Sequence, residues 1–495
     1  MRLNLAAPPT DLESDGIQLV NETGPVQTNH MIGAASLTTR AESPALSRSL
    51  AHDLVLPTLL FMALGGMTWA VRGSSGFGAV NGCVFAGVTW GTAWWFISRD
   101  PGARQGRRYS SGWIILALTV GIGISGNRGW MQWPSFFEGH LQLNTPQGKF
   151  APISRSYGFV WLFIAGVPWA GLGACLLAWC APQRPLRLLD WVLRLSCGLG
   201  IALLLRALFE SFPEVLLPLF KSLKAQYADP VANPNLRRLI GDNRAALVHL
   251  GLYLGFLLYE AIRRDWKNVI LISTVGCVNG IGWALFQNWR WAAPLWPQAN
   301  FNWWRCWESC GGISIGLAYG LAYFFVNRRS IVPQSVAELG KTTNLHPNLE
   351  RFGAYAGLIL GLELSMKNGL KGWANIHIGN EQYWNGILWR ALGPALLCSL
   401  AWLIFRLRSR PILPGFKGDV FPHDCRLMWL VLITQNVIAQ SVTGPYTVWN
   451  EMAFKIYYLL LLLISGVIVQ HFSFLKKRSV QPPLPDESVY CGRVE

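Results

Sequence analysis

About twelve strongly apolar segments recur along this chain, and the connections between them alternate in character. A helix needs about 20 mostly apolar residues to cross a bilayer, and backbone inside hydrocarbon must satisfy its own hydrogen bonds. We therefore predict an all-α, polytopic membrane helix bundle with about 12 transmembrane helices. The predicted spans are 53–71, 79–97, 109–125, 157–180, 188–209, 245–262, 268–286, 309–327, 352–366, 386–405, 427–442 and 452–474.

Composition supports this prediction. Hydrophobic residues make up 52% of the chain and charged residues only 14%, against about 25% charged residues in an average soluble domain. A chain of this composition cannot cover its apolar surface with polar side chains. A net charge of +16 would suggest a nucleic-acid partner in a soluble protein. Here the distribution of the charge points instead to a lipid bilayer, and we expect no nucleic acid.

Positive residues cluster in alternate connections. The connections after the even-numbered spans hold 18 Lys and Arg residues in 73 positions, a higher density than in the connections after the odd-numbered spans. Because Lys and Arg accumulate on the cytoplasmic side, both termini are predicted to be cytoplasmic, in a multi-pass protein of the cell (inner) membrane. Anionic lipids on that side are the expected partners.

The ends of the chain differ from its middle. Residues 1–52 are polar and proline-containing, without an apolar core of signal-peptide length, and residues 475–495 have a similar character. Such segments bury too little apolar surface to fold. We predict disordered cytoplasmic tails at 1–52 and 475–495, with the transmembrane domain between them at 53–474.

The outward connections are rich in Trp, Asn, Arg and Gly. An interfacial aromatic belt is one interpretation, but a belt forms at both interfaces, whereas this enrichment is one-sided. We predict that segments 126–156 and 287–308 dip back toward the membrane and form an outward, Trp-lined polar cavity. The candidate substrate-binding residues are Arg72, Asn127, Arg128, Trp130, Trp289, Arg290, Trp304, Arg305, Glu308 and Trp373.

Charged residues near the predicted outer ends add further candidates. Glu363 and Glu451 are candidates for proton coupling, and Glu138 and His140 for acid/base chemistry. Because Glu138 and His140 are two residues apart, only a loop would bring them together. Spacing of i, i+4 predicts four ion pairs: Arg206/Glu210, Glu260/Arg264, Glu363/Lys367 and Glu451/Lys455.

No cofactor or metal is expected. Cys306 and Cys310 are four residues apart without a further His or Cys at zinc-site spacing. The chain contains none of the common nucleotide-binding or hydrolase motifs. Energy from ATP would have to come from another chain.

Two short stretches resemble known groups. Gly66-Met-Thr-Trp-Ala-Val-Arg72-Gly, with the glycines up to Gly82, resembles an opening motif of an uncharacterised group of bacterial polytopic membrane proteins, and this resemblance implies no activity. Arg104-Gln-Gly-Arg-Arg108 is similar to the end of a loop motif of major facilitator transporters, with Ala103 at a position that is acidic in that motif. The second resemblance implies transport.

These observations lead to one functional interpretation and two alternatives. The favoured function is a secondary transporter or permease for a small polar, anionic or sugar-like solute. The first alternative is a membrane-embedded transferase that acts on a lipid-linked or glycan substrate at the outer face, with Glu138, His140 or Glu308 as base. The second is a structural subunit of a membrane complex.

Overall fold

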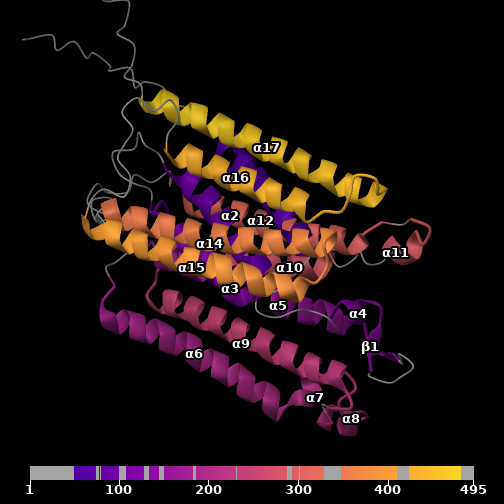
Figure 1. The fold of residues 1–495 in the computed structure, drawn as a ribbon. Helices are drawn as coiled ribbons and strands as arrows, with labels where there is room; N and C mark the ends of the chain where they lie inside the picture. Colours follow the sequence, from indigo (N-terminus) through magenta and orange to yellow (C-terminus); the bar gives the residue numbers. More distant parts are fainter. Residues whose placement is uncertain are drawn as a thin grey trace, which may run out of the picture. The chain divides into compact units, whose positions relative to one another are not determined.

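The computed structural model of the chain is a bundle of long helices (Figure 1). It describes residues 50–73, 77–78, 80–99, 108–126, 133–143, 150–181, 186–229, 231–286, 292–299, 301–327, 347–409 and 423–480. Both predicted tails lie almost entirely outside these residues. At the two domain boundaries, however, helical structure already covers residues 51–55 and continues to residue 480.

Helices make up almost all of the described structure, so the all-α prediction is confirmed. The elements in chain order are η1 (Ala51–Val55, a π-helical turn), α1 (Leu56–Arg72), α2 (Val80–Ser98), α3 (Trp113–Ser125), α4 (Trp133–Phe137), β1 (His140–Gln142), β2 (Phe150–Pro152), α5 (Ser156–Trp179), α6 (Leu188–Ser211), α7 (Pro213–Leu216), α8 (Lys224–Ala228), α9 (Pro234–Ile262), α10 (Trp266–Phe286), α11 (Ala292–Leu295), α12 (Trp303–Asn327), α14 (Pro347–His377), α15 (Glu381–Ser409), α16 (His423–Ser441) and α17 (Trp449–Val480).

Eight helices in the described part of the chain are long and apolar enough to cross a membrane. They are Ala51–Arg72, Ser156–Trp179, Leu188–Ser211, Pro234–Ile262, Trp266–Phe286, Trp303–Asn327, Glu381–Leu407 and Trp449–Lys477. The chain is therefore a multi-pass membrane protein by length and composition. A count of twelve spans and the cytoplasmic placement of the termini remain predictions.

Four predicted spans form helices that are not both long enough and apolar enough to be counted among these eight. The helix α3 has only 13 residues, or about 20 Å at 1.5 Å per residue, which is shorter than the hydrocarbon core. The helix α2 carries Gly, Thr and Asn residues, and nearly all of it is buried inside the bundle. The helices α14 and α16 carry polar and charged side chains among their apolar ones. Helices that pack inside protein need less apolar surface than helices that face lipid.

The helices α1 and α12 lie antiparallel with little space between their backbones. A Cβ atom added at Gly65 would lie 2.1 Å from the Gly312 carbonyl oxygen, and one added at Gly316 would lie 2.4 Å from the Phe61 oxygen. Small residues permit this approach between membrane helices. The end of α1 is thereby held beside the start of α12. We call this end of the bundle the Arg72 end, and the end at which α6 and α10 begin the Arg194 end.

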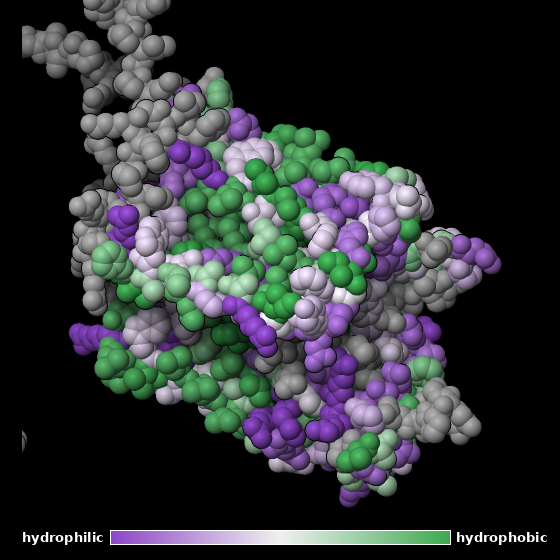
Figure 2. Space-filling model, viewed as in Figure 1, coloured by the Kyte–Doolittle hydropathy of each residue, from purple (hydrophilic) through white to green (hydrophobic). Residues whose placement is uncertain are grey.

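Two peripheral helices expose most of their surface. The helix α6 packs mainly against α9, and α15 packs mainly against α14. The exposed side chains of α6 are largely apolar, and Figure 2 shows apolar residues gathered over the region of α6 and α9. An apolar outer surface of this kind suits contact with lipid.

The two segments predicted to dip back are only partly described. In 126–156 the structure contains the short helix α4, with Trp133 and Phe137 buried, and an antiparallel hairpin of β1 and β2 that pairs His140 with Pro152. In 287–308 it contains α11 and the start of α12. Both segments therefore contain helical structure in their described parts. Their depth relative to a membrane remains a prediction.

Candidate functional site

The most deeply buried charge pair at the Arg72 end joins α1 to α12. Arg72 Nη1 donates to Glu308 Oε2 at 3.1 Å and to Oε1 at 3.3 Å. The two side chains are 3% and 2% exposed. Arg72 is the last residue of α1, and Glu308 lies in the second turn of α12, so the antiparallel packing of these helices brings them together.

Aromatic rings enclose the Arg72 guanidinium. Its Cζ lies 5.4 Å from the Trp69 ring centroid and 4.8 Å from that of Trp169, distances at which a ring face attracts a cation. Gly82 leaves space for the Arg72 side chain, because a Cβ atom there would lie 2.5 Å from the Arg72 Cγ. A β-carbon at Gly73 would similarly lie 2.6 Å from the Glu308 Cγ. These two glycines therefore permit the close packing around the pair.

A second charge pair lies one helical turn away on α12. Arg305 Nη1 donates to Glu451 Oε2 of α17 at 3.1 Å, and the Gly444 amide donates to the same oxygen at 2.7 Å. The Arg305 guanidinium lies 4.7 Å from the Phe454 ring centroid. The first two turns of α12 are therefore joined to α1 through Glu308 and to α17 through Arg305.

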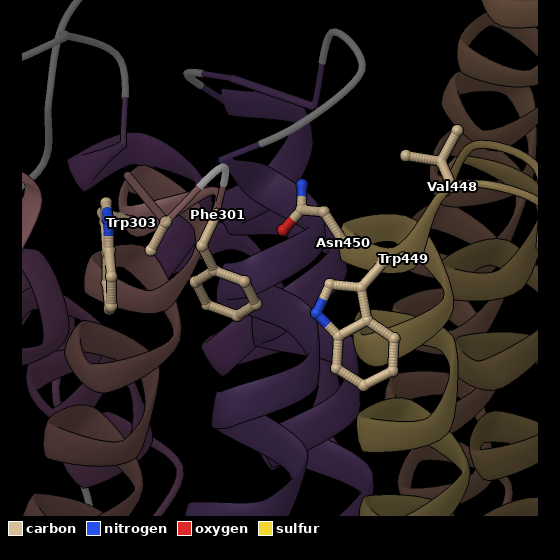
Figure 3. Close-up of a pocket in the computed structure, with 6 residues that line it drawn as sticks. Phe301, Trp303, Val448, Trp449 and Asn450 are labelled. Atoms are coloured by element: carbon tan, nitrogen blue, oxygen red, sulfur yellow. The ribbon is translucent and has the colours of Figure 1, made fainter. Parts of the chain in front are cut away.

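A groove of about 460 Å³ lies beside this second pair. Figure 3 shows Phe301 and Trp303 on one side and Trp449 and Asn450 on the other. Asn450 Oδ1 accepts a hydrogen bond from the backbone N–H of Asn302 at 3.0 Å, which links the two sides of the groove. The lining is mainly apolar, with three aromatic side chains, and it does not include Arg72, Arg305 or Glu308.

The Arg194 end contains another buried charge pair. Arg194 Nη2 of α6 donates to Glu260 Oε1 of α9 at 2.5 Å, and both side chains are buried. The rings of Trp179, Trp191 and Tyr259 lie 5.0, 5.0 and 5.2 Å from the guanidinium. As at Arg72, a cation is enclosed by aromatic faces and bonded to one carboxylate.

This pair continues into a polar network. Glu260 Oε2 accepts from Asn268 Nδ2 at 2.9 Å. Asn268 Oδ1 in turn accepts from the Tyr109 hydroxyl at 2.8 Å and from Arg108 Nη2 at 3.3 Å. Arg108 also forms an ion pair with Asp265. The network therefore connects the segment before α3 to α6, α9 and α10.

Packed aromatic rings connect the two ends of the bundle. Neighbouring ring centroids are 4.5 to 6.3 Å apart along the series Trp304, Trp307, Trp283, Trp169, Trp69, Trp90, Tyr319, Trp94 and Tyr323. Aromatic pairs at these separations attract one another beyond their burial. A continuous series of aromatic rings thus runs through the interior between the Arg72 and Arg194 ends.

The predicted binding residues fall into three groups. Arg72, Trp304, Arg305 and Glu308 gather at the Arg72 end, joined there by Glu451. Trp373 lies near the end of α14 beside His377, with ring centroids 5.3 Å apart. The remaining candidates lie outside the described residues: Asn127, Arg128, Trp130, Trp289 and Arg290. Since the two described arginines each have their own carboxylate, any shared role in binding a solute remains a prediction.

The acid/base candidates lie on the small hairpin. Glu138 is in the turn that follows α4, and His140 is an exposed residue of β1 whose ring packs 5.5 Å from that of Phe150. Gly139 between them has a φ of +81°, which favours glycine. No hydrogen bond between Glu138 and His140 is present in the described structure.

One of the four predicted ion pairs forms as expected. Arg206 contacts Glu210 at 3.1 Å, and Arg244 of α9 contacts the same carboxylate at 3.1 Å. The other three predictions are wrong because tertiary packing supplies different partners. Glu260 pairs with Arg194 instead of Arg264, Glu451 pairs with Arg305 instead of Lys455, and Lys367 contacts Asn385 instead of Glu363.

Sequence reasoning missed most of the Arg194 network. Arg194 was recognisable as a charge inside an apolar segment, but its partner lies 66 positions away. Asn268 and Tyr109 carried no signal of their own. Comparisons with protein-family models, with curated proteins and with solved structures found no match to this chain.

Proposed function

We propose that this multi-pass membrane protein is a secondary transporter for a small polar solute, anionic or sugar-like. The observation that carries the proposal is the Arg72–Glu308 pair, which is almost completely buried at the junction of two helices long and apolar enough to span a membrane. Ionisable side chains at membrane depth are costly, and they commonly mark a substrate or ion pathway.

Buried polar groups at both ends of the bundle favour transport over chemistry at one face. A transporter needs polar groups that continue to the inner side, whereas an enzyme at the outer face needs them at one end only. Arg72 and Glu308 lie at the end predicted to face outward, and Arg194 and Glu260 lie at the opposite end. Aromatic rings between them would suit the faces of a flat or ring-shaped solute.

An anionic solute would act on this pair by replacing Glu308 as the partner of Arg72. The displaced carboxylate would then be a buried charge without a cation, which is costly. It would take up a proton or move toward water, and either event would link solute binding to a second change. Glu451 and Glu363 remain the other candidates for proton coupling.

Uptake into proteoliposomes tests this proposal. The purified protein would be reconstituted and supplied with radiolabelled phosphate, small carboxylates and monosaccharides. We expect uptake of one class, reduced about tenfold or more by Glu308→Gln, because a Gln side chain cannot take up the proton that links solute binding to a second change. Glu210→Gln, in an exposed pair, is the control and should transport normally. Absence of uptake for every class, or full uptake by a folded Glu308→Gln variant, would refute the proposal.

The open groove at the Arg72 end favours a second candidate function. A groove lined by Phe301, Trp303, Trp449 and Asn450 would admit a lipid-linked or glycan substrate, as a membrane-embedded transferase requires. Such an enzyme would convert its substrate in detergent, where no transport is possible. A structural subunit, the third possibility, would show neither activity.

A further inference from the structure

Lys367 on α14 differs from the other buried cations described above. Arg72, Arg194 and Arg305 each have a carboxylate partner within 3.1 Å. Lys367 is 3% exposed, and its Nζ contacts Asn385 Oδ1 at 2.5 Å and Asn368 Oδ1 at 3.4 Å. No ion pair within the described ranges includes Lys367.

The surroundings of Lys367 do not neutralise it. Its Nζ lies 4.4 Å from the Trp389 ring centroid. Lys371, one turn further along α14, adds a second buried cation, whose contact with Glu381 at 2.7 Å involves a carboxylate that is 44% exposed. Glu363, one turn earlier, forms no ion pair with Lys367 among the described residues. A buried ammonium with only neutral partners is unfavourable unless an anion joins it.

We propose that Lys367 and Asn385 form a binding site for a phosphate group between α14 and α15. The Lys367 ammonium supplies the charge, and the Asn385 amide nitrogen, which makes no hydrogen bond in the described structure, supplies a second donor. Lys371 adds positive charge one turn away. Lysine binds phosphate as a point charge, and a phosphate group has enough oxygen atoms to use several such donors at once.

The loose attachment of α15 gives a phosphate group a route to this site. Only 6% of the most apolar stretch of α15 is buried, and its main neighbour is α14. The contacts of Asn385 and Glu381 with the two lysines join the start of α15 to α14. A phosphate group would replace these contacts. It could come from solution or from the headgroup of a lipid lying against α15.

Binding measurements on the full-length protein test this site and distinguish the two sources. In dodecyl maltoside micelles, which contain no phosphate, inorganic phosphate would be titrated by calorimetry. In nanodiscs containing phosphatidylglycerol, retained lipid would be counted by native mass spectrometry. We expect Lys367→Met to lower affinity for at least one of these probes about tenfold or more. Met keeps the length of the side chain and removes a buried charge, so folding should be retained.

Two further variants keep the test independent of folding. Lys476→Met/Asp424→Asn is the matched control, since Lys476 is also buried but forms an ion pair with Asp424 at 2.6 Å, and its affinities should stay at the wild-type value. Asn385→Asp places a carboxylate beside Lys367, and should abolish phosphate binding while it stabilises the fold.

The results for Lys367→Met distinguish a site for free phosphate from a site for a lipid headgroup. Loss of inorganic phosphate binding in Lys367→Met identifies a site for free phosphate, and loss of retained phosphatidylglycerol identifies a lipid headgroup site. Wild-type protein that binds neither probe, or an Asn385→Asp variant that binds as tightly as wild type, would overturn the proposal. The inference does not depend on the transport proposal, because binding is measured without solute movement and Lys367 lies on a different pair of helices.

Discussion

The Arg72–Glu308 and Arg194–Glu260 pairs have the same residue types and similar burial, but they are connected to the protein differently. At the Arg72 end, one arginine nitrogen contacts both oxygens of Glu308, at 3.1 and 3.3 Å. At the Arg194 end, Glu260 uses one oxygen for Arg194 and the other for Asn268, which in turn contacts Tyr109.

This difference indicates in which pair the arginine and the carboxylate separate more easily. When a carboxylate has one principal partner, a competing anion needs to replace only that contact. When each oxygen serves a different helix, release of one partner leaves the others in place, and the network resists separation. We therefore assign the movable contact to Glu308 and the fixed contact to Glu260. Substitutions at the two ends test this assignment.

Replacement of Glu260 should have the largest effect on stability. Glu260→Leu leaves the buried Arg194 without its carboxylate and removes one of the two acceptors of Asn268 Nδ2. Loss of one partner of a buried pair costs about 3–5 kcal/mol of unfolding free energy. The measurement is denaturant unfolding in detergent micelles. Glu210→Leu, in an exposed pair, is the control, and an equal loss in both variants would show that burial does not govern the cost.

Double substitutions should separate the two pairs. Removal of both charges in Arg72→Met/Glu308→Gln should restore most of the stability lost in Glu308→Gln alone, because no unpaired buried charge remains. In Arg194→Met/Glu260→Leu, Asn268 Nδ2 still lacks the shorter of its two hydrogen bonds, at a cost of about 1–3 kcal/mol. The double-mutant cycle for each pair gives the comparison. Equal recovery at both ends would contradict the assignment of Glu260 as a fixed contact.

The sequence predicted the helices better than their partners. Every predicted span overlaps a helix in the described part of the chain, because apolar length is a local property. The i, i+4 rule proposes only partners on the same helix, so it paired Glu451 with Lys455. Packing of α12 against α17 brings Arg305 to Glu451 from 146 positions away.

The candidate site was predictable in part for a different reason. Arg72, Arg305 and Glu308 all flank apolar segments on the same predicted face, so topology alone places them at one end of the bundle. Their division into two separate pairs depends on which helices touch. Which helices touch depends on close glycine contacts such as that of Gly65 on α1 with Gly312 on α12. A single sequence shows the glycines but does not show which helix each of them faces.

A smaller effect is expected from loosening the α1–α12 interface that holds the movable pair. A Cβ atom at Gly312 would lie 2.0 Å from the Gly65 carbonyl oxygen, so Gly312→Ala must separate the helices, at a cost of about 1–3 kcal/mol. The separation should also increase maleimide labelling of the buried Cys83. At Gly200 on α6 an added Cβ meets nothing within 4 Å. Gly200→Ala should therefore be neutral or slightly stabilising, and labelling that stays at the wild-type rate in Gly312→Ala would show that the interface absorbs the extra atom.

The smallest effect is expected at the exposed pair of Arg206 and Glu210. These side chains are 49% and 41% exposed, and Arg244 contacts the same carboxylate at 3.1 Å, so Arg206→Ala leaves Glu210 with a cation. Exposed ion pairs contribute about 0–1 kcal/mol, and salt reduces this further because charges in water are screened. Unfolding of Arg206→Ala should thus differ little from wild type, and the small difference should shrink between low and high salt. A loss as large as that of Glu260→Leu, insensitive to salt, would mean that Arg206 acts through packing of its long side chain. The contrast between exposed and buried pairs would then no longer rest on charge.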